Sequence, residues 1–289
     1  MLLLTGATGV VGRALLPRLL AGGRPVRCLV RDPRRLGPER VRVQLALGDL
    51  ADPPSFRNAL RGVTTVVHLA QARRDQARGS IEELDGIATW RLVEAASRAG
   101  VGRFVFLSAL GASGHSPARF LRAKALAERA VAEAPLPSTT IAPSLVYPAD
   151  RRLPPRLRPL AVLPAMPVPG RGDAEFQPVW AGDVAACVAA VLDGDAPARV
   201  EVCGPERLTR DEVLARLLAA TGRPRALVHV PPPLARGLIR GGELLLRTAA
   251  PVTWDEVELL DVPAISPRGT AGAEALGVVP RRMDEVLPA

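Results

Sequence analysis

The feature that most constrains the fold is the alternation, through the first half of the chain, of short apolar runs with longer amphipathic runs. Short apolar runs predict buried strands, amphipathic runs predict helices, and their alternation is typical of a parallel sheet with crossover helices. The predicted strands span residues 2–5, 26–30, 41–46, 63–69, 103–108 and 139–142. Helices are predicted at 10–21, 53–60, 80–99 and 118–134. We therefore predict an α/β fold with a doubly wound parallel sheet.

The second half of the chain is less regular. Proline and arginine dominate residues 148–172, which predicts a long irregular segment that leads away from the sheet. The pattern then predicts, in order, a helix at 183–192, a strand at 200–203, a helix at 210–220, a strand at 226–230 and mainly helical structure over 234–287. We divide the chain into a core of residues 1–147 and a smaller, mainly helical lobe of residues 148–289, with residues 177–205 returning to the core.

Three predicted helices begin with a capping-box pattern, in which a hydroxyl residue is followed three positions later by a glutamate. The pairs are Ser80 with Glu83, Thr209 with Glu212, and Thr253 with Glu256. Each pair can satisfy backbone amides that the first helical turn leaves unpaired. These patterns fix where helices begin and carry no information about function.

The composition argues against several classes of function. The formal net charge is +9, but the arginines are scattered and only nine aromatic residues are present, so we expect no nucleic acid partner. No apolar run reaches the length of about 18 residues typical of a membrane span, and no charged leader precedes the first strand, which predicts a cytoplasmic protein. The three cysteines lie far apart among apolar residues, so we expect reduced core thiols and no metal site. They are Cys28, Cys187 and Cys203.

A glycine-rich turn lies between the first predicted strand and the first predicted helix. It reads Thr5-Gly6-Ala7-Thr8-Gly9-Val10-Val11-Gly12. In this position the backbone amides of the turn and the positive end of the following helix can bind a pyrophosphate. The succession of strand, glycine turn and helix is typical of a Rossmann fold. We therefore predict a nicotinamide dinucleotide site.

Two arginines indicate which dinucleotide binds. Arg31 follows the second predicted strand, where a dinucleotide site usually has a carboxylate for the adenosine ribose, and Arg13 directly follows the last glycine of the turn. Guanidinium groups at these positions can pair with a 2′-phosphate. NADP(H) is therefore the favoured cofactor. Asp32 could bind a ribose instead, so NAD(H) stays an alternative.

Further motifs accompany the predicted core. They are Gly48-Asp49-Leu50, Val66-Val67-His68-Leu69-Ala70, Phe106-Leu107-Ser108 and Ala142-Pro143-Ser144-Leu145-Val146-Tyr147. With them the chain resembles, over nearly its whole length, the atypical, extended short-chain dehydrogenase/reductases. The resemblance is to the groups similar to the 39 kDa subunit of respiratory complex I and to the NmrA and isoflavone-reductase proteins.

The resemblance implies cofactor contacts at three places: beside the adenine, along the ribose and phosphates, and under the carboxamide. In that order, these are Asp49 and Leu50; Leu69, Ala70 and Gln71; and Pro143, Ser144 and Leu145. It also implies that Ser108 stands near the nicotinamide and that Lys124 hydrogen-bonds the nicotinamide ribose. Structural roles are the alternatives, since Asp49 could cap a turn and Ser108 could cap the segment that follows it.

The chain departs from this resemblance at the residue that usually transfers the proton. Most of the superfamily has a tyrosine four residues before the lysine, on the same helix face, whereas this chain has Phe120 before Lys124. A phenol can act as an acid or base, and a phenyl ring cannot. Lys124 is the only lysine among 38 basic residues. We predict that Lys124 and Ser108 are the catalytic residues; the alternative for Lys124 is a purely cofactor-binding role.

Three functions follow from these observations. The first is an NADPH-dependent reductase of an apolar electrophile such as a quinone or an enone. The second is a non-catalytic NADP(H)-binding module for redox sensing or assembly, which the loss of the tyrosine favours. The third, a sugar-nucleotide epimerase or dehydratase, needs the phenol that Phe120 lacks.

The partner predictions are less specific. We expect a monomer or a homodimer that acts on an unidentified small molecule. Residues 236–247 combine arginines with leucines, a pattern seen both in helices on membrane or protein surfaces and in helices that pack on a lobe. We expect this helix to pack on the second lobe.

Overall fold

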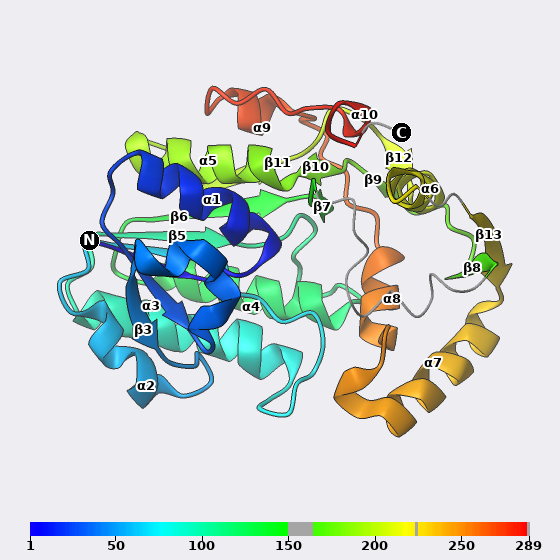
Figure 1. Cartoon of the computed structure of the whole chain (residues 1–289), viewed down its shortest axis with the longest axis horizontal. Coiled ribbons are helices and arrows are strands. Elements are labelled where there is room, and N and C mark those ends of the chain that lie inside the picture. The colour runs from blue at the N-terminus through cyan, green and yellow to red at the C-terminus, as the bar shows by residue number, and fades with distance from the viewer. Residues whose placement is uncertain (150–163, 223–224, 288–289) are drawn as a thin grey trace.

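Seven parallel strands form the main sheet of the computed structural model, which describes residues 1–149, 164–222 and 225–287. The strand order is β11, β6, β5, β4, β1, β2, β3 (Figure 1). The bounds are Leu2–Thr5 for β1, Val26–Val30 for β2, Gln44–Leu47 for β3, Thr65–His68 for β4, Arg103–Leu107 for β5, Ser138–Pro143 for β6 and Arg199–Val202 for β11. The chain order reverses between β1 and β4, so the predicted doubly wound Rossmann sheet is confirmed.

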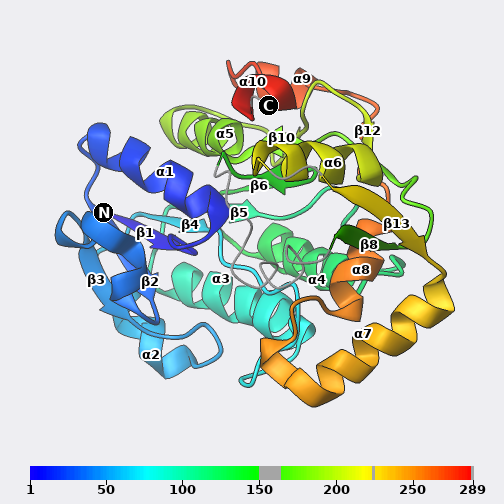
Figure 2. The same ribbon diagram turned by 45° about the vertical axis from the view of Figure 1, so that its right-hand side comes forward.

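Helices cover both faces of this sheet (Figure 2). α1 (Val10–Ala21) and α5 (Ala181–Asp193) lie against each other on one face. The other face carries α2 (Pro53–Arg57), α3 (Ala88–Arg98) and α4 (Arg119–Glu133). Alternate strand residues serve the two faces: in β1, Leu2 and Leu4 pack toward α1 and α5, and Leu3 packs toward the opposite layer. Burial on both faces explains why the strands have continuous apolar runs.

Two elements of the core differ from the predictions. The third strand begins at Gln44 and not at residue 41, because Asp32 accepts a hydrogen bond from the backbone N–H of Arg34 and starts the 3₁₀ segment Pro33–Val41. The helix predicted at 80–99 begins instead with a π-helical turn, Glu82–Ile87, and continues as α3. Ser80 and Glu83 form their predicted capping box, with the Ser80 N–H 2.8 Å from the Glu83 carboxylate.

The second half of the chain adds short strand pairs and helices beside the sheet. The strands are β7 (Val146–Tyr147), β8 (Ala165–Pro169), β9 (Glu175–Phe176), β10 (Val179–Trp180), β12 (Leu208–Thr209) and β13 (Ala226–Val230). The helices are α6 (Arg210–Ala220), α7 (Pro232–Leu246), α8 (Trp254–Leu260), α9 (Ala271–Glu274) and α10 (Met283–Val286). Much of the irregular segment expected at 148–172 lies outside the described residues.

The other two capping boxes also form. The N–H of Thr209 lies 2.7 Å from the carboxylate of Glu212 at the start of α6, and that of Thr253 lies 3.2 Å from the carboxylate of Glu256 at the start of α8. In both pairs the threonine hydroxyl accepts the N–H of the glutamate. The capping predictions are therefore confirmed.

The cysteines lie inside the protein, and all three are free. Cys28 and Cys187 belong to the cluster between the sheet and the α1 and α5 layer. Burial raises the pKa of each of these thiols to about 12, and that of Cys203 to about 11. They remain protonated and unreactive at neutral pH, as predicted for core thiols.

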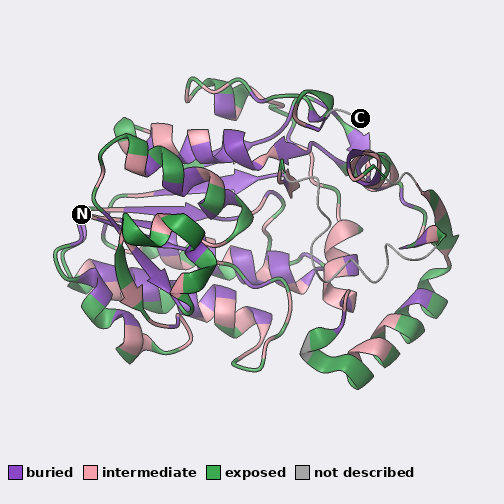
Figure 3. Ribbon diagram, in the orientation of Figure 1, coloured by how far each residue is buried: buried purple, intermediate pink, exposed green. Residues whose placement is uncertain are grey.

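The prediction that residues 236–247 pack on the second lobe is wrong for the leucines. Of α7, only Ala235 is buried, and its leucines are exposed. The helix lies at the edge of the molecule (Figure 3). The helix is attached by its other side: Glu243 accepts the N–H of Trp254 at 2.7 Å, and Arg236 lies over the Trp254 ring. Within the described ranges, no helix is long and apolar enough to cross a membrane.

Candidate functional site

The glycine-rich turn joins β1 to α1 at the carboxyl edge of the sheet. Gly6 has φ +71°, and a Cβ there would lie 2.5 Å from the backbone N of Ala70. A Cβ on Gly12 would lie 2.2 Å from the carbonyl oxygen of Gly6. Only glycine fits at these two positions. The turn therefore leaves a backbone cradle that side chains would fill.

The start of α1 is arranged to receive an anion. Gly9 is its N-cap and offers no side chain to the first-turn amides, and the first turn contains no acidic residue. Ala7, Thr8 and Val11 complete the turn around it, and Val10 is half exposed. Unpaired amides and a positive helix end together favour a phosphate group. The local geometry fits the pyrophosphate of a dinucleotide.

The two arginines predicted to select NADP(H) lie on the surface. Arg31 follows β2 and donates from Nη1 to the side-chain oxygen of Gln76 at 3.2 Å. Arg13 donates from Nε to the carbonyl of Thr8, a turn residue, at 3.1 Å. Asp32, the residue that could select NAD(H), caps the 3₁₀ segment. Both guanidinium groups have further donors available to a ligand.

Asp49 follows β3 and is the residue expected beside the adenine. One carboxylate oxygen accepts the N–H of Ala51 at 3.0 Å, and the other pairs with Arg78 at 2.6 Å. Burial alone would raise its pKa, but these bonds and the nearby Arg31 charge hold the pKa below its usual range. Asp49 caps this turn, and its neighbour Leu50 is half-buried. Their contact with an adenine stays a prediction.

A buried ion pair lies under the carboxyl ends of β4 and β5. Lys124 on α4 is fully buried, and its Nζ donates to the Asp85 carboxylate at 2.8 Å and to the carbonyl of Leu107 at 3.0 Å. The Asp85 carboxylate also accepts the N–H of Ala72 at 3.2 Å. Nζ lies over the Phe120 ring, 5.5 Å from its centroid. The single lysine is therefore completely enclosed.

Sequence reasoning missed Asp85. It lies on the π-helical turn, and such turns are frequent at functional sites. A signal was present, because Asp85 occurs at helical spacing between the apolar Ile81, Ala88 and Leu92, where a solvated carboxylate is not expected. A carboxylate in an apolar stripe requires a buried partner.

His68 forms a second buried hydrogen-bond network, which reaches the backbone of Asp85 through Thr89. Its Nδ1 lies 2.6 Å from the hydroxyl of Thr5, and its Nε2 lies 3.0 Å from the hydroxyl of Thr89. Thr89 donates its only hydroxyl proton to the carbonyl of Asp85 at 2.5 Å, so it accepts from Nε2–H, and Nδ1 accepts from Thr5. Burial, together with the Lys124 charge, lowers the pKa of His68 to about 3. The ring is neutral and both nitrogens are used.

The ends of β4 and β5 present the other predicted contacts. Ala70 lies against Gly6, while Leu69 beside it is buried and Gln71 is exposed. Ser108 is 2% exposed, and its hydroxyl has no hydrogen-bond partner among the described residues. A buried hydroxyl without a partner is uncommon and marks a place where a ligand can supply one. Together with the glycine cradle, this hydroxyl fits a bound nicotinamide dinucleotide.

A cavity of about 310 Å³ lies beyond β6, between the core and α8. The core side contributes Ala109, Leu110, Phe120, Leu121, Pro143, Ser144, Leu145 and Val146. The other side contributes Phe176, Pro251, Val252, Leu259, Leu260, Val262 and Ala264. Among the residues that the structure describes, Arg73 and Glu256 are the only charged ones in this lining. The cavity is suited to an apolar molecule.

Phe120 forms part of the cavity wall, and Lys124 lies behind it. The three residues expected under the carboxamide also line the cavity, and the hydroxyl of Ser144 is already engaged: it donates to the carbonyl of Ala264 at 2.7 Å and accepts the N–H of Gln177. Tyr147, the only tyrosine, is buried elsewhere, in a cluster with Leu208 and Met283. Burial and nearby carboxylates raise its pKa. It is not part of the cavity lining.

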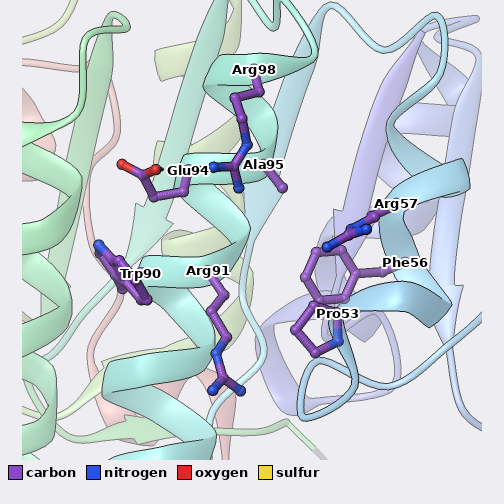
Figure 4. A pocket seen from close by; sticks show the side chains of 8 residues that line it. All are labelled: Pro53, Phe56, Arg57, Trp90, Arg91, Glu94, Ala95 and Arg98. Atoms are coloured by element: carbon purple, nitrogen blue, oxygen red, sulfur yellow. Dashed lines mark hydrogen bonds and ion pairs between the residues drawn. The ribbon is translucent and has the colours of Figure 1, made fainter.

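A second hollow, of about 180 Å³, lies on the surface between α2 and α3 (Figure 4). Its lining consists of Pro53, Phe56, Arg57, Trp90, Arg91, Glu94, Ala95 and Arg98. Glu94 and Arg98 form an exposed ion pair there. None of the predicted site residues lines this hollow, so the candidate site is the glycine turn with the apolar cavity.

Comparison with known proteins agrees with this geometry. Residues 6–194 match the family described as NAD(P)H-binding. An Arabidopsis thaliana protein, NADH dehydrogenase [ubiquinone] 1 alpha subcomplex subunit 9, is 31% identical over 81% of this chain, which spans 61% of that protein's length. A Streptomyces griseus enzyme, (4-alkanoyl-5-oxo-2,5-dihydrofuran-3-yl)methyl phosphate reductase, is also 31% identical, over 84% of this chain and 86% of its own length.

Solved structures show the same fold. The NADPH-dependent quinone oxidoreductase QOR2 of Escherichia coli, solved with NADPH, superposes with a TM-score of 0.73 at 18% identity. The match covers 99% of this chain and 98% of that chain. At this identity the likeness concerns the fold alone.

Proposed function

Because the chain belongs to the NAD(P)H-binding family, and within it resembles the short-chain dehydrogenase/reductases, we propose that it is an NADPH-dependent reductase of an apolar electrophile such as a quinone or an enone. The observation that carries the proposal is the apolar cavity past the ends of β5 and β6, at the same carboxyl edge of the sheet as the glycine turn, with Phe120 in its wall. The relative from Streptomyces griseus supports the choice of a conjugated acceptor, since its name describes a reductase of an alkanoyl-oxo-dihydrofuran that carries a methyl phosphate.

The glycine turn and the residues around it bind the cofactor and orient its nicotinamide. Bound NADPH supplies a hydride. The turn from Gly6 to Gly12 holds the pyrophosphate through backbone amides, and Arg31 with Arg13 pairs with the 2′-phosphate. Ser108 offers its free hydroxyl at the nicotinamide end, where Pro143 and Ser144 form part of the cavity wall.

The residues around the cavity restrict which kind of acceptor can be reduced. Hydride addition to an isolated ketone gives a strongly basic alkoxide, which needs an acid at hand. Phe120 offers no proton, and Lys124 is committed to Asp85 and Leu107. Addition to a quinone or an enone gives a delocalised, less basic anion that water or Ser108 can protonate. We assign Lys124 a positioning role, in which its buried charge and its bonds hold the ends of β5 and α4.

The proposal is tested by turnover. We would follow NADPH oxidation with a naphthoquinone, a cyclohexenone and a cyclohexanone, each with the wild-type protein and with Phe120→Tyr. We expect the first two to be reduced and the saturated ketone not, and we expect the added phenol to raise ketone turnover relative to quinone turnover. Preferential reduction of the saturated ketone by the wild-type protein would contradict the proposal.

A non-catalytic NADP(H)-binding module is the second candidate, and one observation favours it: the residue predicted to be catalytic, Lys124, is fully buried and ion-paired. A protein of this kind would bind NADPH tightly and reduce none of the three acceptors. The same turnover assay therefore separates the two functions.

A further inference from the structure

One helix exposes more apolar surface than its place in the fold explains. Leu234, Leu238, Leu244, Leu245 and Leu246 of α7 are between 52% and 83% exposed. Leu234, Leu238 and Leu245 are spaced by four and seven residues, so they share one face of the helix. Burying large side chains is favourable, and a lone helix with such a face on a protein surface indicates a docking surface.

Arginines accompany this leucine face. Arg236 and Arg240 are four residues apart and lie along one edge of α7, and Arg247 follows its last turn. The only acidic residue of the helix, Glu243, is turned toward Trp254 and accepts its N–H. The exposed side of α7 is therefore apolar and basic, which is the pattern of a helix that lies in a membrane interface.

The helix is held in a fixed position. Arg236 lies over the Trp254 ring at 5.5 Å, and Trp254 begins α8. Arg74 of the core donates to the carbonyls of Ala250 and Pro251, in the segment that connects α7 to α8. With this anchoring, the leucines of the face remain exposed, and most of α7 is coloured as exposed or intermediate in Figure 3.

We propose that α7 docks on an anionic lipid bilayer, with the leucine face at the boundary between headgroups and acyl chains and with Arg240 and Arg247 against the lipid phosphates. Charge decides between the possible occupants. The chain carries a net charge of +9, which attracts an anionic bilayer and repels a second copy of the chain. The α7 face is therefore suited to a lipid surface more than to self-association.

The docked helix would hold the cavity near the bilayer. Pro251 and Val252, which follow α7 within a few residues, belong to the cavity wall. An acceptor dissolved in the lipid would then reach the cavity without crossing bulk water. This last step rests on the proposed reductase function, whereas the docking itself does not.

The test is co-sedimentation of the whole protein with vesicles. We would compare phosphatidylcholine vesicles with vesicles containing phosphatidylglycerol, in the absence of cofactor and acceptor. We expect binding to the anionic vesicles only, weakening as salt is added, and a loss of at least about tenfold in Leu238→Ser/Leu245→Ser. Arg240→Glu should weaken binding less.

Val41→Ser is the matched control, because Val41 is 81% exposed but lies in the core lobe beside β3. It should bind anionic vesicles as the wild type does. No wild-type binding to the anionic vesicles, or undiminished binding by the double leucine variant, would overturn the proposal. So would a dimer in analytical ultracentrifugation that the leucine variant dissociates, which would assign the face to a second copy. Vesicle binding without turnover would leave docking intact and remove only the reductase function.

Discussion

The glycine turn and the apolar cavity, the two halves of the candidate site, are built by different means. The turn is eight consecutive residues, Thr5 to Gly12, whose backbone path is fixed by steric limits at two glycines. The cavity is assembled from segments as distant as Leu110 and Ala264. When one local segment forms a half of the site, the sequence of that segment alone specifies it. A half made from distant segments depends on the contacts that hold them together.

Two arginines make several of those long-range contacts. Arg119 pairs with Asp75 and Glu82 of the core and with Asp255 of α8. Arg74 similarly pairs with Glu256 of α8. We therefore expect substitutions in the turn to abolish cofactor binding. Substitutions of Arg74 or Arg119 should weaken substrate binding and leave the affinity for the cofactor unchanged.

The largest effect on cofactor binding is expected for Gly6→Val. The positive φ and the close approach of Ala70 leave no space for a side chain, so we expect NADPH affinity to fall by at least about a hundredfold, close to 3 kcal/mol. Gly23→Ala is the matched control, because Gly23 has nearly the same φ, +69°, with open space around it. It should cost some stability and keep the affinity. Fluorescence titration measures both, and wild-type affinity in Gly6→Val would contradict the turn as the cofactor site.

The largest effect on the free energy of unfolding is expected at the buried ion pair. Asp85→Asn leaves the charge of Lys124 without its partner in a fully buried place, and the free energy of unfolding should fall by about 3–5 kcal/mol. Adding Lys124→Met should cost less than the sum of the two single changes, because no unpaired charge remains.

Urea unfolding with a double-mutant cycle measures this coupling. Arg129→Ala, which breaks an exposed ion pair with Glu133 on the same helix, is the control and should change stability by no more than about 1 kcal/mol. Additive single effects would show that Lys124 and Asp85 do not act as a pair.

The third effect concerns pH. The pKa of His68 is about 3 in the folded protein and near its ordinary value of 6.5 when unfolded, so the unfolded chain binds the extra proton between these values. Its contribution is fully present above pH 6.5 and is lost as the pH falls toward 3. Between pH 7 and pH 5 it should account for a loss of about 2 kcal/mol. Urea unfolding of the wild type, His68→Gln and the exposed-residue control His115→Gln tests this; an unchanged pH dependence in His68→Gln would contradict it.

The smallest effect is expected for Arg74→Ala, and it separates the cavity from the glycine turn most specifically. This change removes the hydrogen bonds to the carbonyls of Ala250 and Pro251 and the ion pair with Glu256, so the α8 side of the cavity is held less firmly. The KM for the acceptor should therefore rise about tenfold, near 1.4 kcal/mol. The Kd for NADPH should stay unchanged. Arg98→Ala, at an exposed pair on α3, is the control. Equal changes in KM and in the NADPH Kd would show that the two halves are not separable.

The same contrast explains what the sequence could reveal. The glycine turn and the capping boxes are local, and the structure has each where the pattern predicts it. The Asp85–Lys124 pair depends on a π-helical turn, and Arg119 forms ion pairs with Asp75 and Asp255, which are far apart in the sequence. Neither arrangement can be predicted from the spacing of residues within one segment. The exposure of the α7 leucines depends on which side of that helix meets Trp254, and periodicity cannot decide that.

The NADPH site at the glycine turn is tested most directly by titrating the nucleotide-stripped protein with NADPH and with NADH and following nicotinamide fluorescence. We expect NADPH to bind at least about tenfold more tightly than NADH, and Arg31→Ala to remove most of this preference, because a charged hydrogen bond is worth about 1.5–3 kcal/mol. Failure of both nucleotides to bind would contradict the cofactor site itself. Equal binding of both would contradict the choice of NADPH.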